Sequence, residues 1–174
     1  MKYIIFLFVS ILFISCSSLS DKKMIERKTL ETNTINHLLN DWHKAASDAN
    51  FKNYFDLLSS ESIFIGTDAT EIWNKEQFMS YSKPYFDKGN AWSFKTLQRN
   101  LYFSNDFRTA WFDEVLDTSM KLCRGSGVLV RENNSWKIKH YVLSIAIPND
   151  NTEEIVRIKS EIDNTLIKIF SKNK

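Results

Sequence analysis

The spacing of hydrophobic residues changes once along this chain, and that change constrains the fold more than any other feature of the sequence. Before residue 91 the apolar side chains recur at the helical period, and from residue 91 to residue 147 they alternate with polar ones at the period of a strand. Turn residues divide the second region at 104–106, 117–120 and 132–135. We therefore expect an α+β fold in which helices pack on one side of a curved sheet with four long antiparallel strands.

The helical region divides into three segments. The first carries apolar residues at helical spacing, namely Ile35, Leu38, Leu39, Trp42, Ala45, Ala46 and Ala49. A second, shorter helix is expected over residues 51–58, followed by a strand at 62–65 and a turn at 66–68. These segments should supply the layer that covers the sheet.

The third helix has its own start and stop signals. Asn74 can cap it, with Gln77 three residues later completing a capping box. Pro84 should kink or divide the helix, and Gly89 should end it.

Residues 152–172 predict an amphipathic C-terminal helix. Its apolar stripe consists of Ile155, Ile158, Ile162, Leu166 and Ile169. We expect this helix to pack against its own domain, and the alternatives are a dimer contact or docking on a membrane surface. The mixture of acids and bases on its polar face is unlike that of basic membrane-binding helices.

Composition limits the class of protein. The 174 residues suffice for one globular domain, and 14% aromatic residues with only four Gly and two Pro indicate a packed, aromatic-rich core. The net charge of +2 arises from 23 basic and 21 acidic residues without long blocks of one sign. We therefore expect no nucleic acid among the partners.

The N-terminus predicts export. Lys2 precedes an apolar run over residues 4–14, which is shorter than the roughly 20 residues of a membrane-spanning helix and suits a secretion signal. The run ends in Phe13-Ile14-Ser15-Cys16, which resembles the lipobox of bacterial lipoproteins, with Phe where Leu is commoner. The resemblance implies cleavage before Cys16, lipidation of its sulfur and anchoring in the bacterial cell envelope, in the outer membrane rather than the inner one. A plain signal peptide with an incidental cysteine is the alternative.

These observations divide the chain into a signal peptide (1–15), a polar tether (16–28), a folded domain (29–150) and the C-terminal helix (151–174). If Cys16 carries lipid, Cys123 has no partner for a disulfide. We interpret Cys123 as a small hydrophobic residue in a strand, and the alternative is a thiol made reactive by Arg124.

Three sequence segments together resemble a known family. They are GTDATEIWNKE at 66–76, WFDE at 111–114, and CRGSGVLV at 123–130 followed by WKI at 136–138. In this order they resemble the SnoaL-like branch of the nuclear transport factor two-like superfamily, over about residues 35–150. The resemblance implies a cone-shaped α+β barrel, commonly dimeric, with a pocket between sheet and helices. It implies no particular reaction, because the superfamily contains isomerases, cyclases, dehydratases and binding modules.

An acid inside such a cone could transfer protons. On the strand 110–117, alternation separates Asp113 from Glu114. We place Asp113 inside the cone, where Trp111 would desolvate it, and Glu114 outside, toward water or a dimer partner. Alternation on the last strand places His140 inside as well, so Asp113 and His140 form the candidate catalytic pair. A hydrogen-bonded core histidine is the alternative for His140.

Other residues are candidates for lining the pocket. Arg124 could meet Asp113 across the sheet, as a structural ion pair or as an anchor for an anionic ligand. Glu71 and Trp73 follow the turn at 66–68 and should line the entrance, and Trp111 and Tyr141 are further candidates for the pocket wall. Trp92, Tyr102 and Tyr141 add aromatic surface, for which core packing is the usual role.

The sequence lacks several familiar site signatures. Its three histidines have no metal-ligand spacing, and it contains neither a phosphate-binding glycine loop nor a nucleophile elbow. We therefore expect no metal and no cofactor. Three hypotheses for function remain: binding of a small, partly apolar ligand without chemistry, an isomerase, hydrolase or dehydratase that uses Asp113 and His140, and an envelope protein-interaction module.

Overall fold

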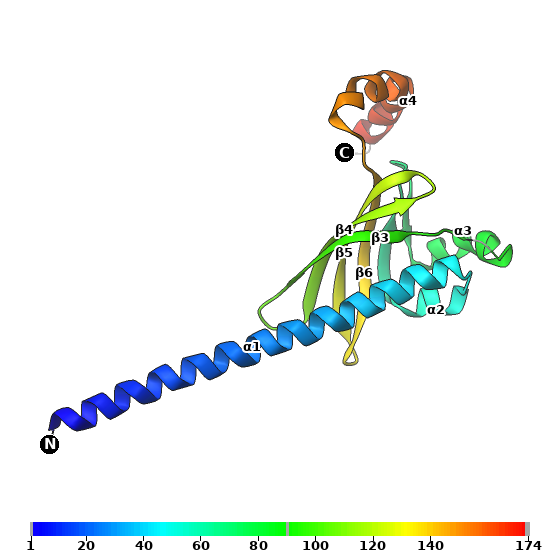
Figure 1. Cartoon of the computed structure of the whole chain (residues 1–174). Coiled ribbons are helices and arrows are strands. Elements are labelled where there is room, and N and C mark those ends of the chain that lie inside the picture. Colours follow the sequence, from blue (N-terminus) through cyan, green and yellow to red (C-terminus); the bar gives the residue numbers. More distant parts are fainter. Residues whose placement is uncertain (1, 90, 173–174) are drawn as a thin grey trace.

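The computed structural model describes the backbone of residues 2–89 and 91–172 and the side chains of residues 21–89 and 91–172. The elements are α1 (Lys2–Ser47), α2 (Phe51–Asp56), β1 (Leu58–Ile65), β2 (Ile72–Asn74), α3 (Lys75–Asp87), β3 (Lys95–Phe103), β4 (Thr109–Thr118), β5 (Lys121–Glu132), β6 (Ser135–Ile145), the 3-10 helix η1 (Asn149–Asn151) and α4 (Thr152–Lys172). Helices come first, four long strands follow, and a helix ends the chain (Figure 1). The predicted α+β order is confirmed.

The six strands form one curved sheet in the order β2-β1-β6-β5-β4-β3. Strands β3 to β6 pair antiparallel with their neighbours, as predicted, but β1 pairs parallel with β6. The sheet is therefore mixed rather than wholly antiparallel, because the long connection through α3 and the later strands brings β6 beside β1 in the same direction. Strands β2 and β3 are the two edges, so the cone is not closed into a barrel.

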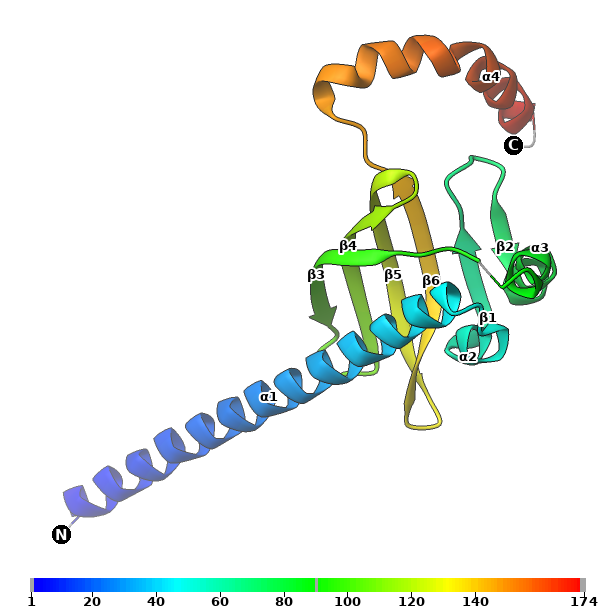
Figure 2. The same cartoon turned by 45° about the vertical axis from the view of Figure 1, so that its right-hand side comes forward.

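Helix α1 covers the inner face of the sheet with its C-terminal part only (Figures 1 and 2). Ile35, Leu39, Trp42 and Ala46 are fully buried there, whereas every residue from 21 to 30 is exposed. The backbone of the predicted tether, residues 16–28, is part of this continuous helix. Within the described residues, no helix combines the length and the hydrophobicity needed to cross a membrane.

Helix α3 begins and ends where its sequence signals predict. The Asn74 side chain accepts a hydrogen bond from the Gln77 backbone N–H at 2.9 Å, and the Gln77 side chain accepts one from the Asn74 N–H at 3.0 Å. Pro84 lies inside α3 without dividing it, because the helix continues for three more residues. Gly89 follows the helix with a φ of 77°, a conformation that glycine adopts without strain.

Helix α4 lies beyond the end of the sheet that is remote from the N-terminus of α1 (Figure 2). None of its described residues is buried, and Ile158 and Ile162 are 65% and 67% exposed. Together with the ends of β1, β2 and β6 it borders an open groove of about 440 Å³. The prediction that this helix packs closely against its own domain is therefore wrong.

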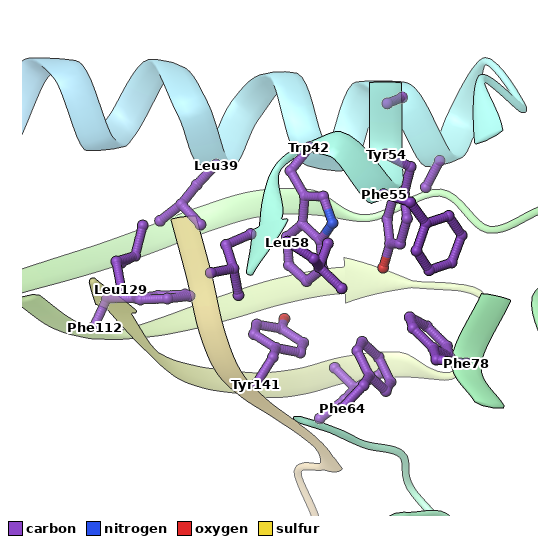
Figure 3. Close-up of a cluster of buried hydrophobic side chains, with 14 of the residues drawn as sticks. Leu39, Trp42, Tyr54, Phe55, Leu58, Phe64, Phe78, Phe112, Leu129 and Tyr141 are labelled. Carbon is purple, nitrogen blue, oxygen red and sulfur yellow. The ribbon is translucent and has the colours of Figure 1, made fainter. Parts of the chain in front are cut away.

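The core fills the space between α1, α2, α3 and the inner face of the sheet (Figure 3). It is built largely from aromatic rings, as the composition predicts. Trp42 of α1 stacks on Tyr54 at 5.1 Å between ring centroids and meets Tyr141 of β6 edge-on at 4.8 Å. Phe64 of β1 stacks on Phe78 of α3 at 4.0 Å. These ring contacts fix the helices on the sheet.

Candidate functional site

The loop between β1 and β2 and the turn between β4 and β5 lie at the same end of the sheet (Figure 2). Residues of this loop and this turn line a cavity of about 210 Å³. Its lining consists of Phe64, Gly66, Thr67, Glu71, Trp73, Phe78, Tyr81, Trp92, Phe94, Ser119, Met120 and Leu143. The volume lies below the range of about 300–1,000 Å³ typical of pockets for drug-sized ligands. The cavity therefore suits a small molecule.

Aromatic rings from four parts of the chain form the floor and the walls of this cavity. Phe64 and Phe78 are 7% and 1% exposed and lie at its floor, where their rings stack. Trp73 stacks on Tyr81 at 4.4 Å, and Trp92 lies 5.8 Å from Phe78. Because these rings pack against one another and against the core, the walls keep their shape without a ligand.

Glu71 stands at the rim of the cavity and is held by the turn that precedes β2. Its Oε2 accepts a hydrogen bond from the Asp68 backbone N–H at 3.2 Å. The Gly66 N–H donates to the backbone carbonyl of Glu71 at 2.9 Å, and a side chain on Gly66 would collide with the Glu71 carboxylate. The glycine thus leaves room for the carboxylate to lie across the turn.

Charge in the cavity is of one sign. Among the described lining residues there is no Lys, Arg or His, and Glu71 is the single formal charge. Burial, with contributions from Tyr85 and the negative charge of Glu71, raises the pKa of Tyr81 to about 12. Tyr81 is therefore a neutral ring at physiological pH.

A second acidic residue, Glu114 of β4, lies fully buried in the core. Its Oε1 lies 2.9 Å from His43 Nε2 of α1 and accepts a hydrogen bond from the Tyr141 hydroxyl at 3.0 Å. Its Oε2 accepts from Arg99 Nε of β3 at 2.9 Å. The carboxylate thus ties α1 to three strands of the sheet.

The protonation of this cluster follows from its contacts. Burial alone raises the pKa of Glu114, but the hydrogen bond and charge of His43 and the guanidinium of Arg99 outweigh burial and hold the pKa below its usual value. Burial and the adjacent Glu114 charge raise the pKa of Tyr141 well above the ordinary value, so Tyr141 stays a hydrogen-bond donor. Both carboxylate oxygens are occupied and none of the group is exposed. The cluster therefore serves to hold the fold together.

The structure places Asp113 on the outer face of the sheet, so the prediction that it points into the cone is wrong. Phe112, Glu114 and Leu116 are buried, whereas Trp111 is 45% exposed. The alternation of the strand was predicted correctly but its facing was inverted, because both faces of β4 carry apolar residues. Asp113 accepts a hydrogen bond from the Asn100 side chain at 3.0 Å.

His140 also lies outside the cone, because a bulge interrupts β6. Val128 pairs with His140 and Leu129 with Ile138, which leaves Lys139 as the extra residue. Ile138 is inside as predicted, but beyond the bulge Tyr141 is the inward residue instead of His140. Tyr141 lies in the core below the cavity and is absent from its lining.

The remaining predicted residues divide between the two faces. Arg124 does meet Asp113, at 4.0 Å between Nη1 and Oδ2, but on the outer face, where its side chain is 60% exposed. Glu71 and Trp73 do line the cavity. Cys123 is fully buried in β5 and 3.5 Å from the Thr118 hydroxyl. The Cys16 side chain lies outside the described residues, and no cluster of metal-ligating side chains occurs within them.

Sequence reasoning missed Glu114, His43 and Arg99 as a group, and it missed most of the cavity wall. One signal was present for His43, which follows Leu39 by four residues and therefore lies on the buried stripe of α1. Trp92 was predicted as aromatic surface with core packing as its usual role, and no local pattern marks Phe94; both residues precede β3 in an irregular segment. Their position depends on α3 and β1.

The cone-shaped sheet, the helices over it and the aromatic cavity at one end define a pocket-bearing α+β domain. Residues 35–148 match the SnoaL-like domain, and the chain belongs to that family. A comparison with curated proteins gives no match.

Several solved structures share this fold. An NTF2-like protein of unknown function from Pseudomonas putida has a TM-score of 0.59 at 12% identity, covering 71% of this chain and 92% of that one. A domain of unknown function with a cystatin-like fold from Nostoc punctiforme has a TM-score of 0.62 at 14% identity, covering 84% and 98%. A proposed dehydratase of the NTF2-like family from Streptomyces avermitilis has a TM-score of 0.61 at 8% identity, covering 70% and 99%. At these identities the likeness concerns the fold alone.

Proposed function

We propose that this protein is a lipid-anchored protein of the bacterial cell envelope whose SnoaL-like domain binds a small, partly apolar molecule without transforming it. The observation that carries the binding role is the open cavity of about 210 Å³ with six aromatic side chains and a rim carboxylate. Preformed, mostly apolar concavities with a few polar groups are the usual form of small-molecule sites.

An enzymatic role that uses Asp113 and His140 receives no support from their positions. Both lie on the outer face of the sheet, away from the cavity, and Glu114 is fully engaged by His43, Arg99 and Tyr141. Binding without catalysis is therefore the better interpretation.

Native mass spectrometry of the full chain in detergent tests the binding role, because a ligand carried through purification adds mass. Tryptophan fluorescence gives a second readout, since Trp73 and Trp92 line the cavity. We expect Ser119→Trp, which narrows the mouth at the turn between β4 and β5, to weaken the binding of any such ligand at least about tenfold. The matched control is Ser135→Trp at the first residue of β6, which lies at the other end of β5. Equal binding by both variants would place the ligand elsewhere.

The anchoring role rests on the lipobox-like sequence at Cys16 and on the exposed part of α1 from residue 21 to residue 30. If residues 16–30 keep the helical rise of 1.5 Å per residue, they hold the domain about 20 Å from the lipid. We expect Cys16→Ser to abolish incorporation of a labelled fatty acid and to release the protein from membranes. Unchanged membrane association of this variant would contradict the anchor.

We also propose a homodimer. Trp111 and Tyr102 are each 45% exposed on the outer face of the sheet, where their rings stack at 5.9 Å. An exposed aromatic pair of this kind is a typical contact surface. Sedimentation analysis should show a dimer that Trp111→Asp dissociates, and a monomer for the unaltered protein would contradict the proposal.

A further inference from the structure

Resting on the proposed binding role, we propose that the ligand is a small organic cation, a quaternary or protonated amine with apolar substituents, held between the aromatic walls of the cavity and Glu71. Three features of the cavity support this assignment: its single charge, the fixed position of that charge and the aromatic rings in its lining.

The charge is uncompensated within the described residues. No Lys, Arg or His contributes to the lining, and no cationic side chain there lies within 4.0 Å of the Glu71 carboxylate. Elsewhere in the domain the buried carboxylate of Glu31 is paired: it contacts Arg131 and accepts a hydrogen bond from Trp136 Nε1 at 2.8 Å. An anionic ligand would meet repulsion at the cavity rim, whereas a cation would supply the missing partner.

The carboxylate is also held in place before a ligand arrives. Oε2 is engaged by the Asp68 N–H, and Oε1 accepts no hydrogen bond from the described residues. The turn is closed by backbone hydrogen bonds from Gly66 to Glu71 and from Glu71 to Asp68, at 2.9 and 3.0 Å. A preorganised acceptor binds with a smaller loss of conformational entropy.

The walls add a second attraction for positive charge. A cation within about 6 Å of the centroid of a Trp, Tyr or Phe ring is attracted by the ring quadrupole, most strongly when it is desolvated. Trp73, Tyr81 and Trp92 supply such rings around one small space. An alkylated ammonium group has apolar surface that the walls can bind and a positive charge that can pair with the Glu71 carboxylate. Its size suits a cavity of about 210 Å³.

Three probes of similar shape and different charge test this inference on the full chain in a nonionic detergent. They are choline, its neutral carbon analogue 3,3-dimethylbutan-1-ol and the anion 3,3-dimethylbutanoate. Binding is followed by the fluorescence of the cavity tryptophans and by calorimetry. We expect choline to bind at least about tenfold more tightly than the alcohol, and the anion to bind most weakly.

Variants test whether the charge of Glu71 is responsible for the preference for a cation. Glu71→Gln should weaken choline at least about tenfold and change the alcohol less than about threefold, because only the charge is removed. Glu61→Gln makes the same change in charge at an exposed residue of β1 outside the cavity and should leave both affinities unaltered. Trp73→Leu should weaken both probes, and choline more than the alcohol, because it removes a ring that attracts the cation.

The outcomes separate this inference from the binding role on which it rests. Equal affinity for choline and the alcohol, or an unchanged choline affinity in Glu71→Gln, overturns the cation assignment and leaves a cavity that binds neutral molecules. Fluorescence and heat that stay constant with probes of all three charges overturn both proposals. The comparison of probes on the unaltered protein decides the matter even if a variant fails to fold.

Discussion

Two carboxylates of this domain contrast in what surrounds them. Glu114 lies in the core with no exposed surface and is contacted by His43, Arg99 and Tyr141. Glu71 lies at the cavity rim, bonded to one backbone N–H of its own turn and to no cation among the described residues. The Glu114 carboxylate makes all its interactions within the fold, whereas the proposed role of the Glu71 carboxylate is to bind a ligand. The contrast teaches that burial and pairing, rather than residue type, separate a structural acid from a binding acid.

The largest effect is expected for Glu114→Leu. The substitution leaves the buried Arg99, whose side chain is 5% exposed, without its counter-charge. Removing one partner of a buried ion pair typically costs about 3–5 kcal/mol of unfolding free energy, which urea denaturation measures. Asp113→Asn, one residue earlier on the outer face, is the control and should cost less than about 1 kcal/mol. Similar losses of unfolding free energy in the two variants would contradict the structural role of Glu114.

A smaller loss is expected for Gly125→Ala. A methyl group on Gly125 would collide with the Tyr141 hydroxyl and lie 3.0 Å from Glu114 Cγ, so it would disturb the bond between these residues. Overpacking of this kind costs about 1–3 kcal/mol. Ser126→Ala, on the exposed side of the same strand, should cost little by the same denaturation assay. A neutral Gly125→Ala would mean that Tyr141 can move without loss.

The pH dependence of stability should also distinguish Glu114. Because its pKa is lower in the folded protein, the unfolded chain binds more protons below the usual carboxyl pKa. The stability that Glu114 contributes is therefore present above about pH 4.5 and is lost as the pH falls through the folded pKa, by at most about 1.4 kcal/mol per pH unit.

Glu31 also has a lowered pKa. Burial raises this pKa, but the hydrogen bonds from Trp136 and Arg131 and the positive charge of Arg131 outweigh burial. The test is therefore the difference between the unaltered protein and Glu114→Gln in unfolding measured from pH 6 to pH 3. The variant should show the shallower loss. Parallel curves would assign the acid sensitivity to other groups.

The smallest effect is expected for Glu71→Gln in the absence of ligand. The glutamine oxygen can still accept the hydrogen bond from the Asp68 N–H, and no ion pair is broken. We expect the unfolding free energy to change by less than about 0.5 kcal/mol in thermal or urea denaturation. A loss above about 1.5 kcal/mol would show that Glu71 serves the fold, and the distinction between the two acids would then disappear.

Much of the secondary structure could be predicted because its signals are local. The capping box at Asn74 and Gln77, the turns at 104–106 and 132–135 and the change of hydrophobic period each involve neighbouring residues. The strand β1 begins at Leu58 rather than at 62, because Leu58 pairs with Ile138 of β6 and the strand therefore includes the polar residues 59–62. The rim residues Glu71 and Trp73 could be predicted for the same reason, since they follow a polar turn and such loops commonly carry binding groups.

The sequence did not predict which face of each strand points into the cone, and most of the site could therefore not be predicted either. On β4 the outer face carries Trp111 and Val115, and the inner face carries Phe112 and Leu116, so apolar content alone does not choose between them. On β6 one bulged residue, Lys139, exchanges the positions of His140 and Tyr141. Each error moved a candidate residue to the opposite side of the sheet.

The sequence by itself determined the α+β order, the four long strands, the caps and turns and the aromatic character of the core, because those properties depend on spacing within a few residues. Only the tertiary structure decided that Glu114 is the buried acid and that Glu71 shares a cavity with Trp92 and Phe94. Glu114 meets His43, which lies 71 positions away, through the packing of α1 on the sheet. Contacts of that separation form when whole elements pack, and no local pattern encodes them.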